Sequence, residues 1–152
     1  MALNFQGRVW RDGRFWLIEV CALDVMTQGR TRKEALEMLK DAVESLVDRS
    51  GFEVDVTLRT KNAVILGTRG GQNDKLLAAF FLKQQRAKNG LSLNQVVGRL
   101  KITKNAYAQY EQGRSLPSLA KIQEFVAAMN DNAVFAVDVL GAKKRHPKGI
   151  KS

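Results

Sequence analysis

Residues 91–117 read LSLNQVVGRLKITKNAYAQYEQGRSLP, and this stretch decides the fold of the second half of the chain. Ser92 followed by Gln95 forms a capping box, because each side chain can satisfy a free N–H group at a helix start. Lys101-Ile102 gives a tight turn, Thr103 can cap a second short helix, and Gly113 ends it. The stretch therefore predicts two short helices joined by a turn.

Apolar residues at three- and four-residue spacing predict one further helix on each side of this pair. The earlier helix starts at Asp74 and carries the apolar residues Leu76, Leu77, Phe80 and Phe81. The later helix opens at Pro117-Ser118, with Leu119, Ile122, Phe125, Val126 and Met129 facing inward. Residues 74–130 are thus expected to form a compact bundle of four short helices.

The same stretch resembles the helix-turn-helix of the Cro and phage-repressor type. The matching features are Gln95, the turn at Lys101-Ile102, the helix from Thr103, Glu111-Gln-Gly113, and Pro117 before an apolar helix. The main departure is Gly98, where that family usually has a bulkier residue. The resemblance implies a DNA-binding domain whose helix from Thr103 is the recognition helix.

The residues of this helix suit that task without the family name. A recognition helix keeps one face for its own bundle and offers hydrogen-bonding side chains to base edges from the other. Tyr107 and Tyr110 are expected on the inner face. The base-reading candidates on the outer face are Lys104, Asn105, Ala108 and Gln109.

Three further residues are candidates for phosphate contacts. Gln95 and Thr103 stand at helix N-termini, where free N–H groups already favour anions, and Arg114 follows the recognition helix directly. The alternative for residues 74–130 is a four-helix interaction module that does not touch DNA.

The net charge of +10 is located in one half of the chain. Residues 1–68 carry ten Lys and Arg against ten Asp and Glu, whereas residues 69–152 carry fifteen against five. A basic module favours a polyanionic partner, because neutralised phosphates release condensed counterions. The alternative is a basic surface that serves solubility.

The first half predicts a small α+β layer. Residues 3–10 and 15–23 have strand composition, and Asp12-Gly13 between them favours a tight hairpin. Thr27-Gln28-Gly29 has turn composition, and a capping box from Thr31 to Glu34 starts an amphipathic helix that runs to about Arg49. Residues 52–59 then alternate as a half-buried strand, and a second short strand over 63–66 is an option.

These patterns predict the following organisation. Residues 1–68 form a sheet-and-helix domain, 69–73 a linker, and 74–130 the DNA-binding domain. Residues 131–141 hold a strand expected to pair with its copy in a second subunit, and 142–152 a basic tail expected to be disordered. We expect the two domains to fold separately at Gly70-Gly71.

Residues Thr27 to Leu36, followed by Leu39 and Ala42, resemble the HicB antitoxin signature, in which a strand pair leads through a capping box into a helix carrying Glu-Ala. The resemblance covers about residues 5–60. It implies a degraded ribonuclease H-like fold that inhibits a HicA-like, mRNA-cleaving toxin, within a homodimer or homotetramer. With the second half it implies an antitoxin that represses its own operon by binding double-stranded operator DNA. The alternatives are a stand-alone regulator whose first half only dimerises or senses a ligand, and an enzyme of the ribonuclease H type.

No constellation for catalysis is expected. Glu19 and Asp24 could in principle hold a metal with Asp41 or Glu44, but the last two fall away from the apolar stripe of their helix, which favours a solvated face. His146 has no Ser, Cys or carboxylate partner nearby in the sequence. We therefore predict no enzymatic activity, no metal and no cofactor.

Cys21 is the one cysteine, so no internal disulfide can form, and a lone cysteine is expected to be a small buried residue. No apolar run approaches the roughly 20 residues needed to span a bilayer. We expect a cytoplasmic protein that does not contact membranes.

Overall fold

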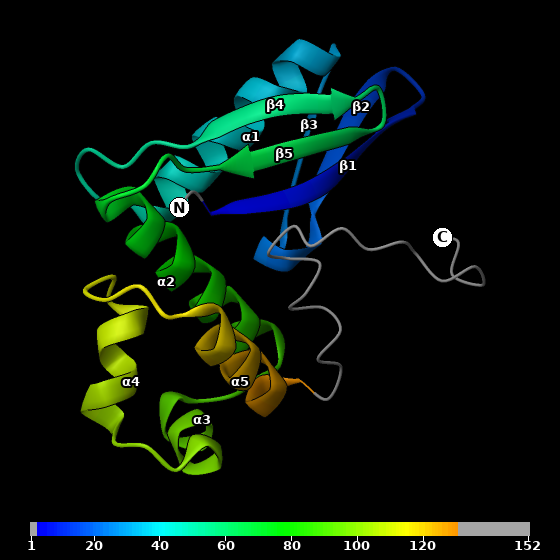
Figure 1. Cartoon of the computed structure of the whole chain (residues 1–152). Helices are drawn as coiled ribbons and strands as arrows, with labels where there is room; N and C mark the ends of the chain where they lie inside the picture. The colour runs from blue at the N-terminus through cyan, green and yellow to red at the C-terminus, as the bar shows by residue number, and fades with distance from the viewer. Residues whose placement is uncertain (1–2, 131–152) are drawn as a thin grey trace.

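The computed structural model describes residues 3–130, which form an antiparallel sheet followed by helices, so the fold is mixed α and β (Figure 1). The elements in chain order are β1 (Asn4–Asp12), β2 (Phe15–Val20), the 3-10 helix η1 (Cys21–Leu23), β3 (Val25–Gly29), α1 (Arg32–Val47), β4 (Asp55–Thr60), β5 (Ala63–Gly67), α2 (Gln72–Lys88), α3 (Leu93–Leu100), α4 (Lys104–Glu111) and α5 (Leu119–Met129). The predicted strand at 131–141 and the predicted tail at 142–152 lie outside the described residues.

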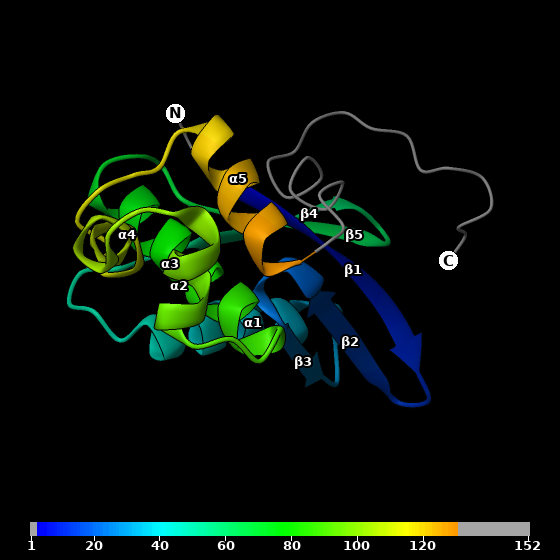
Figure 2. The ribbon, with the colours of Figure 1, turned by 90° about the horizontal axis from the view of Figure 1, so that it is seen from below.

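The sheet has five strands in the order β3-β2-β1-β5-β4, and all neighbours are antiparallel. Directly paired residues share a face, so the pairs Val9–Ile18 and Phe5–Leu66 place buried side chains on one face. Helix α1 lies against this face and contacts β3, β2 and β4. One face of the sheet is therefore the core face. Figure 2 shows the sheet and the helices from below.

The structure corrects three strand predictions. Residues 25–29 form β3, although Thr27-Gln28-Gly29 has turn composition; Gly29 is there because a Cβ would lie 2.6 Å from the backbone nitrogen of Ala35 in α1. Strand β4 starts at Asp55, so the buried Phe52 and Val54 belong to the preceding loop. Residues 21–23 form the 3-10 helix η1 instead of continuing β2.

Helix α2 begins inside the predicted linker, at Gln72, and its start is fixed to the end of the sheet. The buried carboxylate of Asp74 accepts hydrogen bonds from the Thr68 hydroxyl (2.5 Å) and the Gly70 N–H (3.0 Å). Gln72 and Asn73, which were predicted as part of a linker over 69–73, therefore form the first turn of α2. A buried carboxylate needs hydrogen-bond partners, so Asp74 holds the start of α2 against Thr68 and Gly70.

Helix α2 packs on the sheet module as well as on the other helices. The ring centroids of Phe81 and Phe5 are 5.3 Å apart, and the side-chain amides of Gln84 and Gln85 donate to the carbonyls of Leu23 (2.7 Å) and Ala22 (2.9 Å). The buried residues form one hydrophobic cluster that runs from β1 to α5. The core is therefore continuous across the two halves.

Two exposure predictions are wrong. Cys21 is exposed, because η1 turns its first residue outward while Ala22 and Leu23 fill the core. The part of the thiol that the protein covers and the nearby Glu19 both raise the pKa of Cys21. Leu119 is 53% exposed at the start of α5, although it was expected to face inward. Among residues 3–130, no helix is long and apolar enough to cross a membrane.

Candidate nucleic-acid interface

The predicted helix-turn-helix is formed by α3, the turn at Lys101–Thr103 and α4. The capping box at its start is present: the Ser92 hydroxyl accepts from the Gln95 N–H (3.1 Å), and the Gln95 side-chain oxygen accepts from the Ser92 N–H (2.7 Å). Lys101 ends α3 with a φ of 58°, and its N–H donates to the carbonyl of Val97. The Thr103 hydroxyl then accepts from the Ala106 N–H at 3.1 Å and starts α4.

The inner face of α4 is the one predicted from the sequence. Tyr107 is fully buried, with its ring 5.1 Å from that of Phe125 in an edge-to-face arrangement, and Tyr110 packs 5.3 Å from the same ring. The Tyr107 hydroxyl makes no hydrogen bond of standard geometry among the described residues. Burial, together with the nearby carboxylate of Glu111, raises its pKa far above the ordinary value. Tyr107 therefore remains neutral. Its packing against Phe125 fixes the rotation of α4 about its own axis.

An ion pair fixes the C-terminal end of α4 on α2. Arg86 donates to both carboxylate oxygens of Glu111, at 2.9 and 3.0 Å, and a third N–H group reaches the Leu91 carbonyl at 3.2 Å. Glu111 is buried, and its hydrogen bonds raise the pKa of Arg86 further. Such a bidentate pair fixes geometry as well as charge. Arg86 lies outside the motif at residues 91–117, so nothing in that motif indicated its role.

Gly113 ends α4 in the left-handed conformation, with a φ of 74°. Its N–H donates to Tyr110, and the N–H of Arg114 donates back to Gln109 at 2.9 Å, which closes the last turn. A Cβ at Gly113 would lie 2.7 Å from the Cδ2 atom of Leu76, so a larger residue would displace that side chain as well as strain the backbone. The predicted helix end is confirmed, and it holds Arg114 at the surface.

The base-reading candidates all lie on α4 and reach solvent to different degrees. Lys104 and Asn105 are exposed, whereas Ala108 and Gln109 are partly buried. Asn105 and Gln109 are four residues apart on one helix, so their side chains lie on the same face. The first turn of α4 therefore presents the most accessible candidates.

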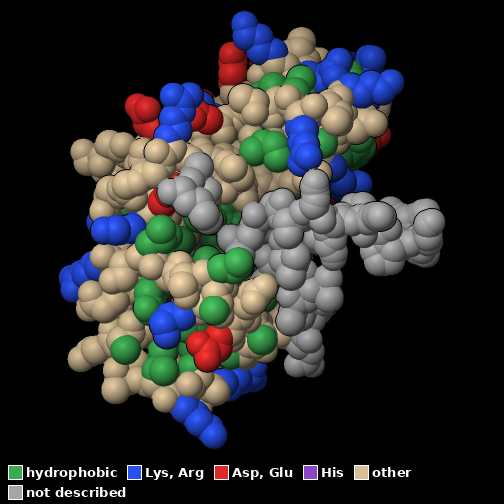
Figure 3. Space-filling view, in the orientation of Figure 1, with side chains coloured by type: hydrophobic (Ala, Val, Ile, Leu, Met, Phe, Trp, Pro, Cys, Tyr) green, Lys and Arg blue, Asp and Glu red, His purple; other side chains and the backbone are tan. Residues whose placement is uncertain are grey.

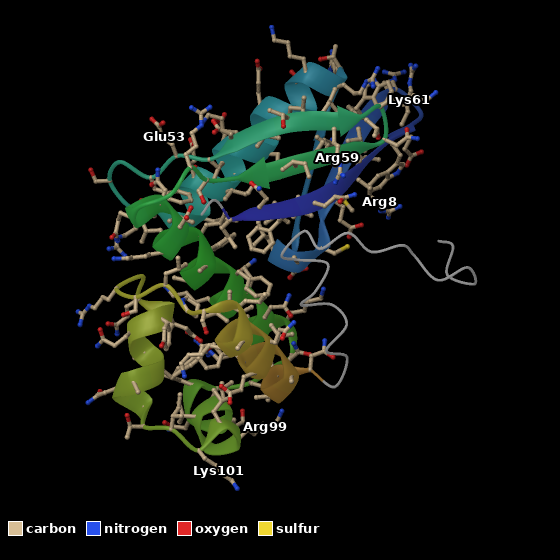
Figure 4. All side chains as sticks on the ribbon, viewed as in Figure 1. Arg8, Glu53, Arg59, Lys61, Arg99 and Lys101 are labelled. Carbon is tan, nitrogen blue, oxygen red and sulfur yellow. The ribbon has the colours of Figure 1, made fainter. Side chains whose placement is uncertain are left out.

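The three phosphate candidates are exposed near the ends of α3 and α4. The amide nitrogen of Gln95 remains a donor, because the capping box uses its oxygen. One candidate was missed: Lys101 in the turn is exposed and points away from the domain in Figure 4. The sequence contains a clue to this candidate. A lysine occupies the turn, where the positive φ would strain glycine less.

The electrostatics of this domain follow from which charges are buried. Residues 69–130 hold ten Lys and Arg but only Asp74, Glu111 and Glu124 as acids. Asp74 and Glu111 are buried and hydrogen-bonded, so Glu124 is the acidic residue that remains at the surface. The exposed surface of the helical part is therefore more basic than its composition suggests, which favours phosphate contacts.

Two of the four carboxylates considered for a metal site have other partners. Glu19 pairs with Arg8 at 3.1 Å, and Glu44 pairs with Lys40 at 2.6 Å and accepts from the Val54 N–H at 3.0 Å. Within residues 3–130, no three His, Cys, Asp or Glu side chains gather as a group that could hold a metal ion.

A comparison with protein families matches residues 77–130 to a helix-turn-helix domain. The match spans most of α2 and all of α3, α4 and α5. Comparisons with curated proteins and with solved structures gave no match. The family match and the geometry of α3 and α4 together indicate a DNA-binding helix-turn-helix.

Proposed function

This chain carries a DNA-binding helix-turn-helix at residues 77–130, and we propose that it is an antitoxin. In this role it represses its own operon and neutralises a HicA-like, mRNA-cleaving toxin. In this proposal α4 reads operator bases, and the sheet module of residues 3–67 binds the toxin. The protein acts by binding and has no enzymatic activity of its own.

The observation that carries the DNA-reading part is the division of α4 into two faces. Tyr107 and Glu111 hold its inner face through Phe125 and Arg86, while Lys104 and Asn105 stay exposed. A helix held this rigidly can enter the major groove, which is wide enough to admit it, and place short polar side chains against base edges. Asn and Gln pair best with adenine, and Lys reaches guanine.

Phosphate contacts would set the register of α4 on the duplex. Gln95 and Thr103 start α3 and α4, where unpaired N–H groups favour anions, and Arg114 follows the end of α4. Two copies of the chain would place two recognition helices about 34 Å apart, one turn of duplex, on a palindromic operator.

The toxin-binding part rests on the order of elements that resembles HicB antitoxins and on the outer side of α1. The Thr31 hydroxyl accepts from the Glu34 N–H at 3.0 Å at the start of this helix. Met38 and Leu46 are exposed apolar residues on α1, at 47% and 58%, beside the exposed acids Glu37 and Asp41. An apolar surface with acidic neighbours suits a basic protein partner.

The DNA-reading part is tested by selecting duplexes from a random library with the full-length protein. We expect enrichment of a palindrome with half-sites one helical turn apart, and protection of that sequence upstream of the protein's own gene. Recovery of duplexes without a shared sequence would contradict base reading by α4.

The toxin part is tested with the gene next to this one. Its product should arrest growth when expressed alone, and co-expression of the full-length chain should restore growth and yield a co-purifying complex. If the full-length chain represses its promoter but binds no neighbouring product, the stand-alone regulator is the correct description.

A further inference from the structure

We propose that the hairpin end of the sheet is a second nucleic-acid site, which binds single strands and is separate from the recognition helix. The site, called the hairpin-end cluster below, consists of seven cations on the segments that meet at this end of the sheet, two of which, Arg11 and Arg32, lie over the Trp16 ring. The seven are Arg11, Arg14, Arg30, Arg32, Lys33, Arg59 and Lys61. The inference goes beyond operator binding and toxin binding and depends on neither.

Three separate segments converge at this end of the sheet. The β4–β5 turn lies beside β1 near the β1–β2 turn, because the Val9 N–H donates to the Asn62 carbonyl at 2.9 Å. The start of α1 joins them through Arg32, which donates to the carbonyl of Lys61 at 3.3 Å. The guanidinium carbons of Arg32 and Arg11 lie 4.9 and 5.8 Å from the centre of the Trp16 ring.

The positive charges of the sheet module are concentrated at this end. Residues 1–68 are neutral in total, but the cluster holds seven of their ten cations and has only Asp12 and Glu34 as neighbouring acids in the same segments. Glu34 is engaged as a helix cap, since it accepts from the Arg30 N–H. Among the described residues, the seven cations form no ion pair, whereas Arg8, whose guanidinium carbon lies 4.2 Å from the centre of the neighbouring Trp10 ring, pairs with Glu19.

Clustered, unpaired cations repel one another, so this arrangement lowers stability unless an anion is bound. Figure 3 shows Lys and Arg side chains gathered over this end of the sheet. Contacts to backbone carbonyls hold Arg11 and Arg32 in place and leave most of their N–H donors unused. A polyanion would meet several pre-positioned donors at once.

Aromatic residues between the cations favour a single strand as the ligand. Residues 8–16 read RVWRDGRFW, and the side chains of Trp10, Phe15 and Trp16 are all partly exposed. Bases in a duplex are stacked on one another, whereas unpaired bases can stack on aromatic rings and guanidinium planes. Duplex binding would use only the charges of this cluster.

The cluster lies far from the DNA-reading surface. Arg59 and Lys61 are at the sheet's hairpin end in Figure 4, while Lys101 in the helix-turn-helix is at the opposite end of the molecule. A straight duplex held by α4 therefore does not reach the cluster. The protein can hold operator DNA and a single strand at the same time.

Tryptophan fluorescence gives a readout that is local to this end of the sheet, because both tryptophans of the chain, Trp10 and Trp16, lie on the β1–β2 hairpin, one on each face. The full-length protein is titrated with unlabelled 20-nucleotide single strands, as RNA and as DNA of the same sequence, and with the duplex of that sequence. Binding of each is followed in parallel by anisotropy of a labelled copy. We expect single strands to quench the fluorescence and the duplex to bind without quenching; the RNA and DNA arms show which single strand is preferred.

A triple variant removes charge without removing any contact that the structure shows: Arg14→Gln, Lys33→Gln and Lys61→Gln. The matched control removes three exposed or partly exposed charges elsewhere, with Lys75→Gln, Lys83→Gln and Lys121→Gln. The cluster variant should bind the single strand on the order of 10- to 100-fold more weakly at 0.1 M salt, with a salt slope smaller by about 2. The control should keep the affinity detected by quenching.

Three results would overturn the proposal. One is unchanged fluorescence when anisotropy shows the single strand bound, since the strand then lies elsewhere. Another is an equal loss for the cluster variant and its control, which would mean that only net charge matters. The third is equal quenching by duplex and single strand, because the aromatic residues would then have no role.

Discussion

Arg86 in α2 and Glu111 in α4 form a bidentate ion pair, with N–O distances of 2.9 and 3.0 Å, beneath the recognition helix. The side chain of Glu111 is 6% exposed and that of Arg86 25%, so water hardly competes for the pair. The pair therefore fixes α4 against the helix that also packs on the sheet.

Glu111→Gln should lower the free energy of unfolding by about 3 kcal/mol, because it leaves a partly buried guanidinium without its counter-charge. Denaturation in urea measures the loss. The exposed pair of Arg69 and Asp55 is the control, and Arg69→Gln there should cost less than about 1 kcal/mol. Equal losses in the two variants would mean that burial does not decide the value of the Arg86 pair.

Tyr107→Phe should leave stability unchanged or raise it by up to about 1 kcal/mol, because the hydroxyl is buried without a hydrogen bond of standard geometry. Thermal unfolding checks this. Phe125→Ala should instead cost about 3 to 5 kcal/mol, since it removes the ring on which both tyrosines pack. A clear loss of stability in Tyr107→Phe would reveal a partner for the hydroxyl.

Gly98→Ala should stabilise the protein by roughly 0.5 to 1 kcal/mol. Gly98 lies inside α3, and a Cβ at this position would meet nothing within 4 Å. Alanine therefore gains helix propensity without a clash. Gly113→Ala is the opposite case, because it combines a positive φ with a contact to Leu76 and should destabilise. If Gly98→Ala stabilises but weakens DNA binding, the open space above it is where DNA approaches the backbone.

Asn105→Ala and Gln109→Ala should each cost about 1 to 3 kcal/mol of discrimination at one base pair of the operator. Gln95→Ala and Arg114→Ala should weaken binding to operator and scrambled duplex alike, because phosphate contacts carry no sequence information. Titrations on both duplexes separate the two effects. Equal losses on both duplexes for Asn105→Ala would remove it from the base-reading set.

A fragment of residues 69–152 should be less stable than the full chain by about 3 kcal/mol or more, because Phe81 would lose its packing against Phe5 and face water. Urea denaturation of the two proteins measures the difference. Phe81→Gln should destabilise the full chain strongly and the fragment little. A fragment as stable as the full chain would restore the separate folding of two domains that the glycines at 70 and 71 suggest.

The sequence predicted the elements that depend on local chemistry. The capping residues Thr31, Ser92, Thr103 and Ser118 all accept the expected N–H group, and Gly113 ends α4 as expected. These contacts join residues only a few positions apart, so residue type and spacing determine them. The apolar period of α4 likewise placed Tyr107 inward correctly.

The predictions from the sequence were wrong where one residue type is common in two different structural settings. Gly29 has turn chemistry but stands in β3, because α1 passes too close for a side chain. Cysteine is usually buried, but Cys21 is exposed, because η1 changes the direction of the chain after β2. Both outcomes depend on elements that pack from elsewhere in the molecule.

Tertiary structure alone decided how the two halves are joined. Residues 76–82 of α2 are all buried, which is typical of a helix covered on every side, and its partners range from Phe5 in β1 to helices α4 and α5. By itself the sequence determined a basic helix-turn-helix attached to a neutral sheet module. Only the packed fold brings residues that are far apart in the chain within contact distance. Such contacts include the packing of the shared helix α2, the pair of Arg86 with Glu111, and the stacking of Arg11 and Arg32 over Trp16.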